Sequence, residues 1–312
     1  MDIFPHNKTY DFMGKRWLAY LISLFTIVAS FYLWFSKGED KYGLDFTGGH
    51  EIVVRVEGGP GSEALREALS QIGLDDVTVQ SFELGSNEYS IRFGENEEDD
   101  MHVNAADQTA AVRESVREAL LKKFPNRVEI LSADFVGPTV GKELRRQATW
   151  AALLSLVAML CYIGYRFEMA FGVGALVAGF HDVVVAIGIY LLCGHSINMS
   201  ALAGALTIVG YSVNDTIVVY DRIREEIVLQ KGKSLEEIIN YSVSVTLNRT
   251  IITNLLTFFS AVALYFFCSG AVEDMSLLFM AGVITGTFST IYVASPVSLA
   301  WADFREARAK KK

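Results

Sequence analysis

Cysteine is scarce in this chain of 312 residues, and the long polar segment that follows its first apolar run has none. The three cysteines lie in or at the end of apolar segments, at Cys161, Cys193 and Cys268. This distribution excludes a disulfide-stabilised scaffold and a thiolate metal site. We interpret all three as small packing residues.

Sequence motifs of the common enzyme classes are also missing. The chain has no Gly-x-Ser-x-Gly, His-Glu-x-x-His, phosphate-binding loop or paired-cysteine motif, so we expect neither an enzyme nor a bound cofactor or metal. The segment from Lys37 to Arg146 holds 22 acidic and 13 basic residues, which accounts for the whole formal net charge of −9. The rest of the chain is balanced, and no nucleic-acid partner is indicated.

Apolar residues, in contrast, make up 51% of the chain, and its mean hydropathy is +0.30. The first apolar run is uncharged and long enough to cross about 30 Å of hydrocarbon. It is too long for a signal peptide and no small-x-small cleavage site follows, so we expect a retained helix. The last run contains Pro296, where we expect a kink or an end. We predict a polytopic α-helical membrane protein with six transmembrane helices, at residues 17–35, 150–165, 171–192, 200–220, 246–267 and 277–300.

Among the chain ends and the short connections between these helices, Lys and Arg occur only at alternate positions. Lys and Arg occur before the first helix, in every second loop and after the last helix, whereas loops 193–199 and 268–276 have none. Because basic loops favour the cytoplasmic side, we predict that both termini are cytoplasmic and that the polar segment is exported. The predicted order is a cytoplasmic N-terminus, one helix, an exported domain, a five-helix bundle and a basic tail, at residues 1–16, 17–35, 36–147, 148–304 and 305–312.

The exported segment changes to the periodicity of an α+β domain. Its pattern predicts βαββαβ, the ferredoxin-like arrangement. We expect Ser62 to cap the first helix, and a turn at residues 84–87. The acidic run GENEEDD after Phe93 predicts a solvated loop, because consecutive carboxylates lack the spacing of a calcium loop. The elements are predicted at 50–56, 62–72, 77–82, 88–93, 108–124 and 127–136.

The predicted 221–245 loop contains a helix start of its own. Ser234 is followed three residues later by Glu237. This spacing predicts a capping box that opens a short cytoplasmic helix.

Few ionisable residues lie inside the spans. An ionised Asp in hydrocarbon costs about 2.5 to 3.5 kcal/mol, so its presence at Asp215 indicates a function. At 1.5 Å per residue, Asp215 lies about 7 to 10 Å from the cytoplasmic end of its helix. Arg249 lies one to two turns inside the next, antiparallel helix. We therefore predict that the two lie at similar depth. They form either a static ion pair that fixes helix register or a proton site, in which the carboxylate is protonated when the guanidinium moves away.

Two further groups of residues are candidates. His181 and Asp182 lie near the middle of the third span, where Asp182 is either part of a proton relay or hydrogen-bonded across helices to Asn214, Ser212 or Thr207. The run GLDFTGG comprises Gly43, Asp45, Gly48 and Gly49 among its residues. It follows no strand and lacks a phosphate-loop Lys, so we predict a tight lead into the first strand rather than a nucleotide site.

Four stretches, in order, resemble the SecF family of Sec protein-export subunits. They are GLDFTGG, the pair His181-Asp182, GYSVNDTIVVYDRIRE from Gly210 to Glu225, and TLNRTIITN from Thr246 to Asn254. The resemblance covers essentially the whole chain. The sister family SecD shares the DRIRE-type signature but has a much larger exported region, for which this chain has no room.

The resemblance implies the resistance-nodulation-division superfamily and the bacterial inner membrane. It implies SecD as the partner in a twelve-helix unit, association with the SecYEG channel and in many bacteria with YajC, and use of the proton-motive force in late translocation of preproteins. Asp215 and Arg249 match the family's proton-pathway positions; Asp182, His181 and Asn214 are our further candidates. We expect protonation of Asp215 to reposition the helices and thereby move the exported domain, which holds the preprotein. The membrane lipids are further expected partners. Sodium is the alternative coupling ion, because an Asp beside Asn and Thr oxygens can serve either.

Two alternative functions make different predictions. A small-molecule or lipid exporter of the same superfamily predicts two large loops per chain and an internal duplication, neither of which the sequence has. A structural scaffold without ion coupling predicts that Asp215→Asn is tolerated.

Overall fold

The described residues of the computed structural model form two compact units. The helical unit comprises Met1–Ser36, Ala151–Tyr190 and Ser200–Lys312, and the α/β unit comprises Lys37–Trp150 and Leu191–Met199. The structure describes residues 8–72, 74, 77–81, 87–94, 105–125, 127–166, 169–268 and 270–309.

The α/β unit is built on a small sheet. In the described part of this unit, four strands form one antiparallel sheet in the order β2-β3-β1-β4. Helix α3 (Ser62–Ser70) lies between β1 and β2 in the chain, and α4 (Ala105–Lys123) lies between β3 and β4. The element order is therefore βαββαβ, which confirms the predicted ferredoxin-like domain. The strands are β1 (Gly49–Val56), β2 (Val77–Ser81), β3 (Glu88–Phe93) and β4 (Val128–Val136).

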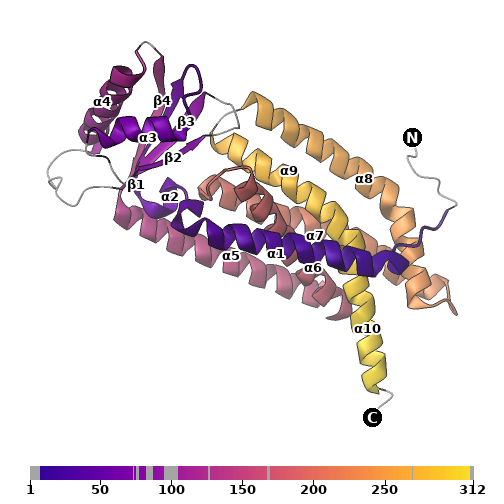
Figure 1. Cartoon of the computed structure of the whole chain (residues 1–312). Helices are drawn as coiled ribbons and strands as arrows, with labels where there is room; N and C mark the ends of the chain where they lie inside the picture. The colour runs from indigo at the N-terminus through magenta and orange to yellow at the C-terminus, as the bar shows by residue number, and fades with distance from the viewer. Residues whose placement is uncertain are drawn as a thin grey trace. The chain divides into compact units, whose positions relative to one another are not determined.

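The core of this unit lies between the sheet and its two helices. In β1 the buried side chains alternate along the strand, as a half-buried strand requires. Leu65 and Leu69 of α3 and Val116 and Leu120 of α4 join the same cluster of buried residues as the strands. Both helices therefore cover one face of the sheet (Figure 1).

The chain enters β1 through the 3₁₀ turn η2 (Gly38–Lys41) and the single helical turn α2 (Leu44–Thr47). Gly48 and Gly49 follow with φ of 73° and 110°, in the region that favours glycine. A Cβ at Gly49 would lie 2.5 Å from the Phe93 carbonyl oxygen of β3. Only glycine therefore permits this tight approach of the lead-in to the sheet.

Some predicted details of this unit differ. Ser62 is not the cap of α3: the N-cap is Gly61, with φ of 85° and no side-chain cap bond, so the helix starts one residue earlier than a capping Ser62 requires. The predicted acidic loop after Gly94, and all but Asn87 of the predicted 84–87 turn, lie outside the described residues.

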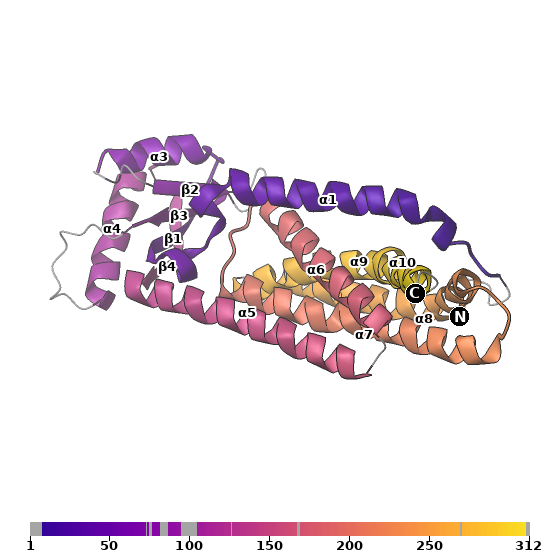
Figure 2. The same cartoon turned by 90° about the horizontal axis from the view of Figure 1, so that it is seen from below.

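Among the described residues, six helices of the chain are long and apolar enough to cross a membrane, as predicted. They are drawn in Figure 1 and, turned by 90°, in Figure 2. Helix α8 packs along α9. A 3₁₀ turn, η1 (Met13–Lys15), precedes the first of them. The helices are α1 (Arg16–Ser36), α5 (Pro138–Arg166), α6 (Met169–Leu192), α7 (Met199–Leu229), α8 (Leu235–Phe267) and α9 (Ala271–Ser289), which continues into α10 (Ser295–Ala309).

Several helices are longer than hydropathy predicts. Helix α5 begins at Pro138, so the predicted domain limit at residue 147 lies inside a helix. Helix α7 runs on to Leu229. In its last turns, Arg222 forms ion pairs with Glu225 and with the buried Glu226 at helical spacing. The predicted 221–245 loop is therefore wrong: only a short turn separates α7 from α8.

The predicted capping box is confirmed, but the helix it opens is not a separate one. Ser234 accepts from the Glu237 backbone N–H, and the Glu237 side chain accepts from the Ser234 backbone N–H. This helix, α8, continues without a break to Phe267. The helix that begins at the capping box and the fifth predicted span, residues 246–267, are therefore one continuous helix.

The last span changes its helical geometry once. Between α9 and α10 lies η3 (Thr290–Ala294), a π-helical turn, followed by Pro296. The Ser295 hydroxyl donates to the Thr290 carbonyl, five residues earlier, which suits the wider turn. The predicted irregularity at Pro296 is thus a π turn just before it, and the helix goes on.

The outer surface of the helical unit is apolar. Exposed Trp, Phe, Leu and Tyr side chains cover α1, α5 and α8, as a hydrocarbon surrounding favours. Cys161, Cys193 and Cys268 are also exposed. Our interpretation of the cysteines as packing residues is therefore wrong. They lie exposed in or at the end of apolar segments.

Candidate functional site

Asp215 lies on α7 and is buried, with 7% of its surface exposed. Its side-chain hydrogen-bond partner is Asn254 of α8, and Arg249 of α8 acts on it through charge. Within the described part of the chain, no ion pair joins Asp215 to Arg249, and Arg249 is exposed. The structure therefore brings the predicted pair onto neighbouring helices without direct contact. Asn254, inside the TLNRTIITN stretch, holds the carboxylate.

Asn254 is the centre of a polar cluster. The Tyr211 hydroxyl of α7 lies 2.8 Å from Asn254 Oδ1 and 2.9 Å from Thr257 Oγ1. Asn254 Nδ2 donates to Thr287 Oγ1 of α9 at 2.7 Å. The cluster thus ties α7, α8 and α9 together around Asp215. The sequence analysis singled out Asp215 and Arg249 but missed Asn254, Thr257 and Thr287, because nothing in the sequence distinguishes these from other polar residues of the spans.

Asp182 of α6 forms a second buried cluster and has no exposed surface. The Ser212 hydroxyl of α7 donates to it, and the Ser289 hydroxyl of α9 donates at 2.7 Å. His181 Nδ1 lies 3.1 Å from its other oxygen. Of the three hydrogen-bond partners weighed from the sequence, Ser212 is in contact. Ser289 was missed, since it lies far along the chain in the last span.

Hydroxyl groups continue on the same side of α7. The Thr216 hydroxyl lies 3.1 Å from that of Thr290, and the Tyr220 hydroxyl donates toward the Ala294 carbonyl at 3.0 Å, with Ser298 Oγ 2.8 Å away. Ser212, Thr216 and Tyr220 are four residues apart and share one face of the helix. Helix α7 is therefore held on one side through Asp215 and on another through Asp182 and this row of hydroxyls.

Asn214 and Arg249 differ from the buried groups. Both residues are exposed, Asn214 on α7 and Arg249 on α8. The structure does not bring Asn214 into the Asp182 cluster. A polar amide and a guanidinium exposed on membrane-spanning helices need a partner other than lipid.

The Gly43–Gly49 motif lies in the α/β unit and contacts the loop between α6 and α7. Gly43 N donates to the Ile197 carbonyl at 2.7 Å. Asp45 Oδ2 accepts from the backbone N–H of Met199 at 2.8 Å. The sequence predicted the lead into the strand but not this contact, because residues 43 and 199 are far apart in the chain.

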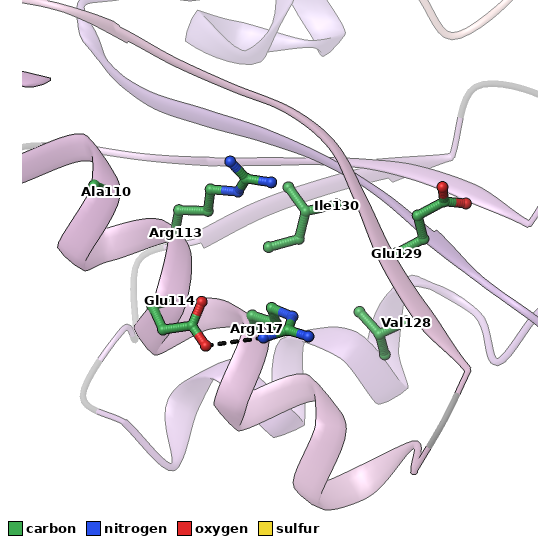
Figure 3. Close-up of a pocket in the computed structure, with 7 residues that line it drawn as sticks. All are labelled: Ala110, Arg113, Glu114, Arg117, Val128, Glu129 and Ile130. Atoms are coloured by element: carbon green, nitrogen blue, oxygen red, sulfur yellow. Dashed lines mark hydrogen bonds and ion pairs between the residues drawn. The ribbon is translucent and has the colours of Figure 1, made fainter.

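A groove of the α/β unit lies between α4 and β4 (Figure 3). Its volume is about 510 Å³. Arg113 and Arg117 of α4 face Val128 and Ile130 of β4 across it. Arg117 is ion-paired with Glu114 at 3.0 Å. Among the described residues, no group of three His, Cys, Asp or Glu side chains could hold a metal ion.

These features define a class: a membrane transport protein with six spans, a ferredoxin-like domain outside them, and carboxylates buried between helices. A family model for the protein export membrane protein SecD/SecF, C-terminal part, matches residues 116–303. The chain is 37% identical over 304 residues to the protein translocase subunit SecF of Rickettsia bellii, covering 97% of each chain. It is 37% identical over 300 residues to that of Rickettsia prowazekii, covering 96% of this chain and 93% of the relative. The chain belongs to the SecD/SecF family.

Solved structures agree with this assignment. The crystal structure of SecDF from Thermus thermophilus, a translocon-associated membrane protein, matches with a TM-score of 0.82 and 32% identity over 96% of this chain. SecDF in a super-membrane-facing form matches with a TM-score of 0.67 and the same 32% identity, over 98% of this chain. This chain spans 40% of each SecDF chain.

Proposed function

We propose that this chain is the SecF subunit of a bacterial protein translocase and that it uses the proton-motive force to assist export of preproteins. The subunit assignment rests on identity of 37% over nearly the full length of curated SecF proteins. The observation that carries ion coupling is Asp215, a buried carboxylate inside a span that is held by a hydrogen bond to the next helix. A static helix does not need so costly a group at this depth.

SecD is the proposed partner of the face that exposes Asn214 and Arg249. The solved SecDF chains are longer than this one, which spans 40% of them. A charged side chain at the centre of a span costs about 2.5 to 3.5 kcal/mol when only lipid surrounds it. Cover by the SecD part, with a polar or acidic group opposite Arg249, removes that cost. The SecYEG channel and, in many bacteria, YajC complete the proposed assembly.

Protonation of Asp215 is the proposed switch. The ionised carboxylate accepts from Asn254 and is favoured by the charge of Arg249. A proton removes the charge, so the attraction of Arg249 is lost and one oxygen becomes a donor. Asn254 is also bonded to Tyr211 and Thr287, so a change at Asp215 affects the packing of α7 against both α8 and α9.

The energy available suits a domain movement. Each elementary charge that crosses the membrane releases about 2.3 kcal/mol per 100 mV, which biases a two-state equilibrium by about fiftyfold. The two SecDF forms match this chain with equal identity but TM-scores of 0.82 and 0.67. That difference in TM-score supports the idea that members of the family adopt more than one conformation. In our proposal, the α/β unit is the exported part that moves while it holds the emerging preprotein.

Both termini are placed on the cytoplasmic side of the inner membrane in this proposal. The basic residues before α1 and in the α10 tail support that orientation. Cysteine labelling from outside tests it, in a chain whose native cysteines are serines: Glu57→Cys in the α/β unit reacts with a membrane-impermeant maleimide in intact cells, and Lys8→Cys does not. The reverse pattern contradicts the orientation.

The experiment for coupling compares Asp215→Asn and Arg249→Met with Asp221→Asn, a carboxylate on the same helix that is exposed. In cells depleted of SecD and SecF, the first two variants are expected to accumulate precursor and to lose translocation-linked proton conductance, and the control is not. Unchanged export and conductance in both variants leaves a scaffold without coupling. Exchanging sodium at fixed pH decides between the two ions.

A further inference from the structure

The α6–α7 loop is held by the segment that leads into the α/β unit. Ile197 N donates to the Lys41 carbonyl at 2.7 Å, and Gly43 N donates to the Ile197 carbonyl at 2.7 Å. Tyr42 and Ile197 thus pair as a parallel bridge. Residues 191–199 accordingly belong to the α/β unit rather than to the helices they connect.

Asp45 adds a bond to the very start of α7. Its Oδ2 accepts from the backbone N–H of Met199, the first residue of that helix, at 2.8 Å. The first N–H groups of a helix have no partner within the helix, and a carboxylate there is also favoured by the helix dipole. Asp45 therefore caps, from another part of the chain, the helix that carries Asp215.

Arg92 of β3 fastens the same contact from the sheet. The residue is largely buried, and its guanidinium donates to the Tyr42 carbonyl at 2.8 Å and to the Ser196 hydroxyl at 2.8 Å. Burial lowers the pKa of Arg92 from its ordinary value, and the nearby carboxylates of Glu51 and Asp40 act in the opposite direction. One buried cation thus connects the lead-in segment, the loop and the sheet.

Space at this contact is limited. A Cβ at Gly43 would lie 3.1 Å from the Asn198 Cβ and 3.2 Å from the Ile197 carbonyl oxygen. A side chain at Gly43 would therefore need the neighbouring loop to shift by a few tenths of an ångström. The motif residues Gly43 and Asp45 both serve the contact with the loop, and Gly48 and Gly49 serve the turn into β1.

We infer that this contact between Lys41–Asp45 and the 191–199 loop is a rigid joint that passes a displacement of α7 to the α/β unit, with Asp45 as its positioning residue. From Met199 the helix continues without a break to Asp215, about 24 Å away at 1.5 Å per residue. A rigid helix displaced at Asp215 moves at Met199 as well. The inference rests on the proposed function, in which the state of Asp215 drives the movement.

The first experiment separates coupling from proton binding. Asp45→Ala removes the cap, and Asp45→Asn keeps an acceptor oxygen in its place. We expect Asp45→Ala to reduce export driven by the proton-motive force about fivefold, the factor that corresponds to loss of a typical helix cap. Asp45→Asn should retain most of it, and both variants should keep the proton conductance that Asp215→Asn loses.

Normal export in Asp45→Ala together with defective export in Asp215→Asn would overturn the joint and leave the proposed function intact. Normal export in both overturns the proposed function and the joint with it. Loss of conductance in Asp45→Ala also contradicts the joint, because a positioning residue in the α/β unit must leave the proton site working.

The second experiment locks the joint. Gly43→Cys with Asn198→Cys, in a chain whose native cysteines are serines, places the two Cβ atoms within a few tenths of an ångström of disulfide geometry. We expect the cross-link to form in membranes and export to continue, because the joint stays closed as α7 moves. Failure to cross-link, or export lost on oxidation and restored by a reductant, would show that the segments separate, and the inference falls. The single-cysteine variants are the controls.

Discussion

Helices α7 and α9 approach closely at Gly282, and we predict strong coupling between that residue and Ile208. A Cβ at Gly282 would collide with Cγ1 and Cδ1 of Ile208 and would lie 2.7 Å from its Cγ2. One turn further on, a Cβ at Gly286 would lie 3.2 Å from the Ser212 side chain. Small residues four apart let two membrane helices pack backbone to backbone. The perturbation is Gly282→Ala, alone and with Ile208→Ala.

The expected magnitudes follow from these contacts. Gly282→Ala forces a methyl group into a packed site, which costs about 1 to 3 kcal/mol. Ile208 is 1% exposed, and Ile208→Ala leaves a cavity at a cost of about 2 to 5 kcal/mol. We expect about 2, because lipid is as apolar as the core and little transfer energy is lost. In the double variant the new methyl group enters the vacated space, so the total should be smaller than the sum by about 1 to 3 kcal/mol.

The assay is unfolding of the full chain in detergent micelles for the wild type, both single variants and the double variant. Gly210→Ala on α7 is the matched control, since a Cβ there meets nothing within 4 Å. Additive effects, within about 0.5 kcal/mol, would refute the close approach of α7 and α9 at this point. A destabilised Gly210→Ala would refute the use of these distances to rank the glycines.

Three further predictions concern other contacts. Gly188→Ala should destabilise α1 against α6 by about 1 to 3 kcal/mol, because its Cβ would lie 2.9 Å from the Ser30 Cα; Ser30→Gly should rescue it only in part in micelle unfolding. Tyr220→Phe should cost about 1 kcal/mol, since a fully buried hydroxyl bond to the Ala294 carbonyl is lost; an unchanged unfolding midpoint contradicts this. The hydrogen bond from Lys123 lowers the pKa of Glu67, so this pair stabilises above the unfolded-state pKa and ceases to as pH falls through the folded value. Glu67→Gln should therefore speed amide exchange in α3 at pH 7 and not at pH 3, and an equal effect at both contradicts the pair.

Much of the α/β unit could be predicted because local patterns determine it. The alternation in HEIVVRV and the breaks at glycine and Pro125 place strands and helices close to their observed limits. The capping box at Ser234 is equally local. The cap at Ser62 failed because Gly61, with a positive φ, already starts that helix.

The helix ends at α7 and α8 could not be predicted from hydropathy. Charged residues after Tyr220 mark the end of an apolar run, but Arg222 and Glu226 continue the helix as an ion pair. Hydropathy measures where a helix leaves lipid, whereas helical spacing of opposite charges decides where it stops. The end of an apolar run and the end of a helix are therefore two separate predictions, and the sequence carries a signal for each.

The candidate site depended on long-range packing. Asp215, Arg249 and Asp182 stand out because charge is rare in a span. Their neighbours Asn254 and Ser289 are ordinary polar residues, and only the packing of helices shows that they hold the carboxylates. The exposure of Arg249 is likewise a property of the folded surface. The residues with chemistry were thus predictable, and the residues that bind them were not.

The loop at residues 191–199 has a consequence for how this protein can be recombined. By sequence, the α/β unit looks like a cassette inserted between the first and second spans. Its own Gly43 and Asp45 are nevertheless satisfied by Ile197 and Met199, which are encoded two helices later. A chimaera that grafts only residues 37–150 onto another subunit would separate partners that fit each other. The inherited module is discontinuous, and substitutions at Gly43 and Asn198 must be exchanged as a pair.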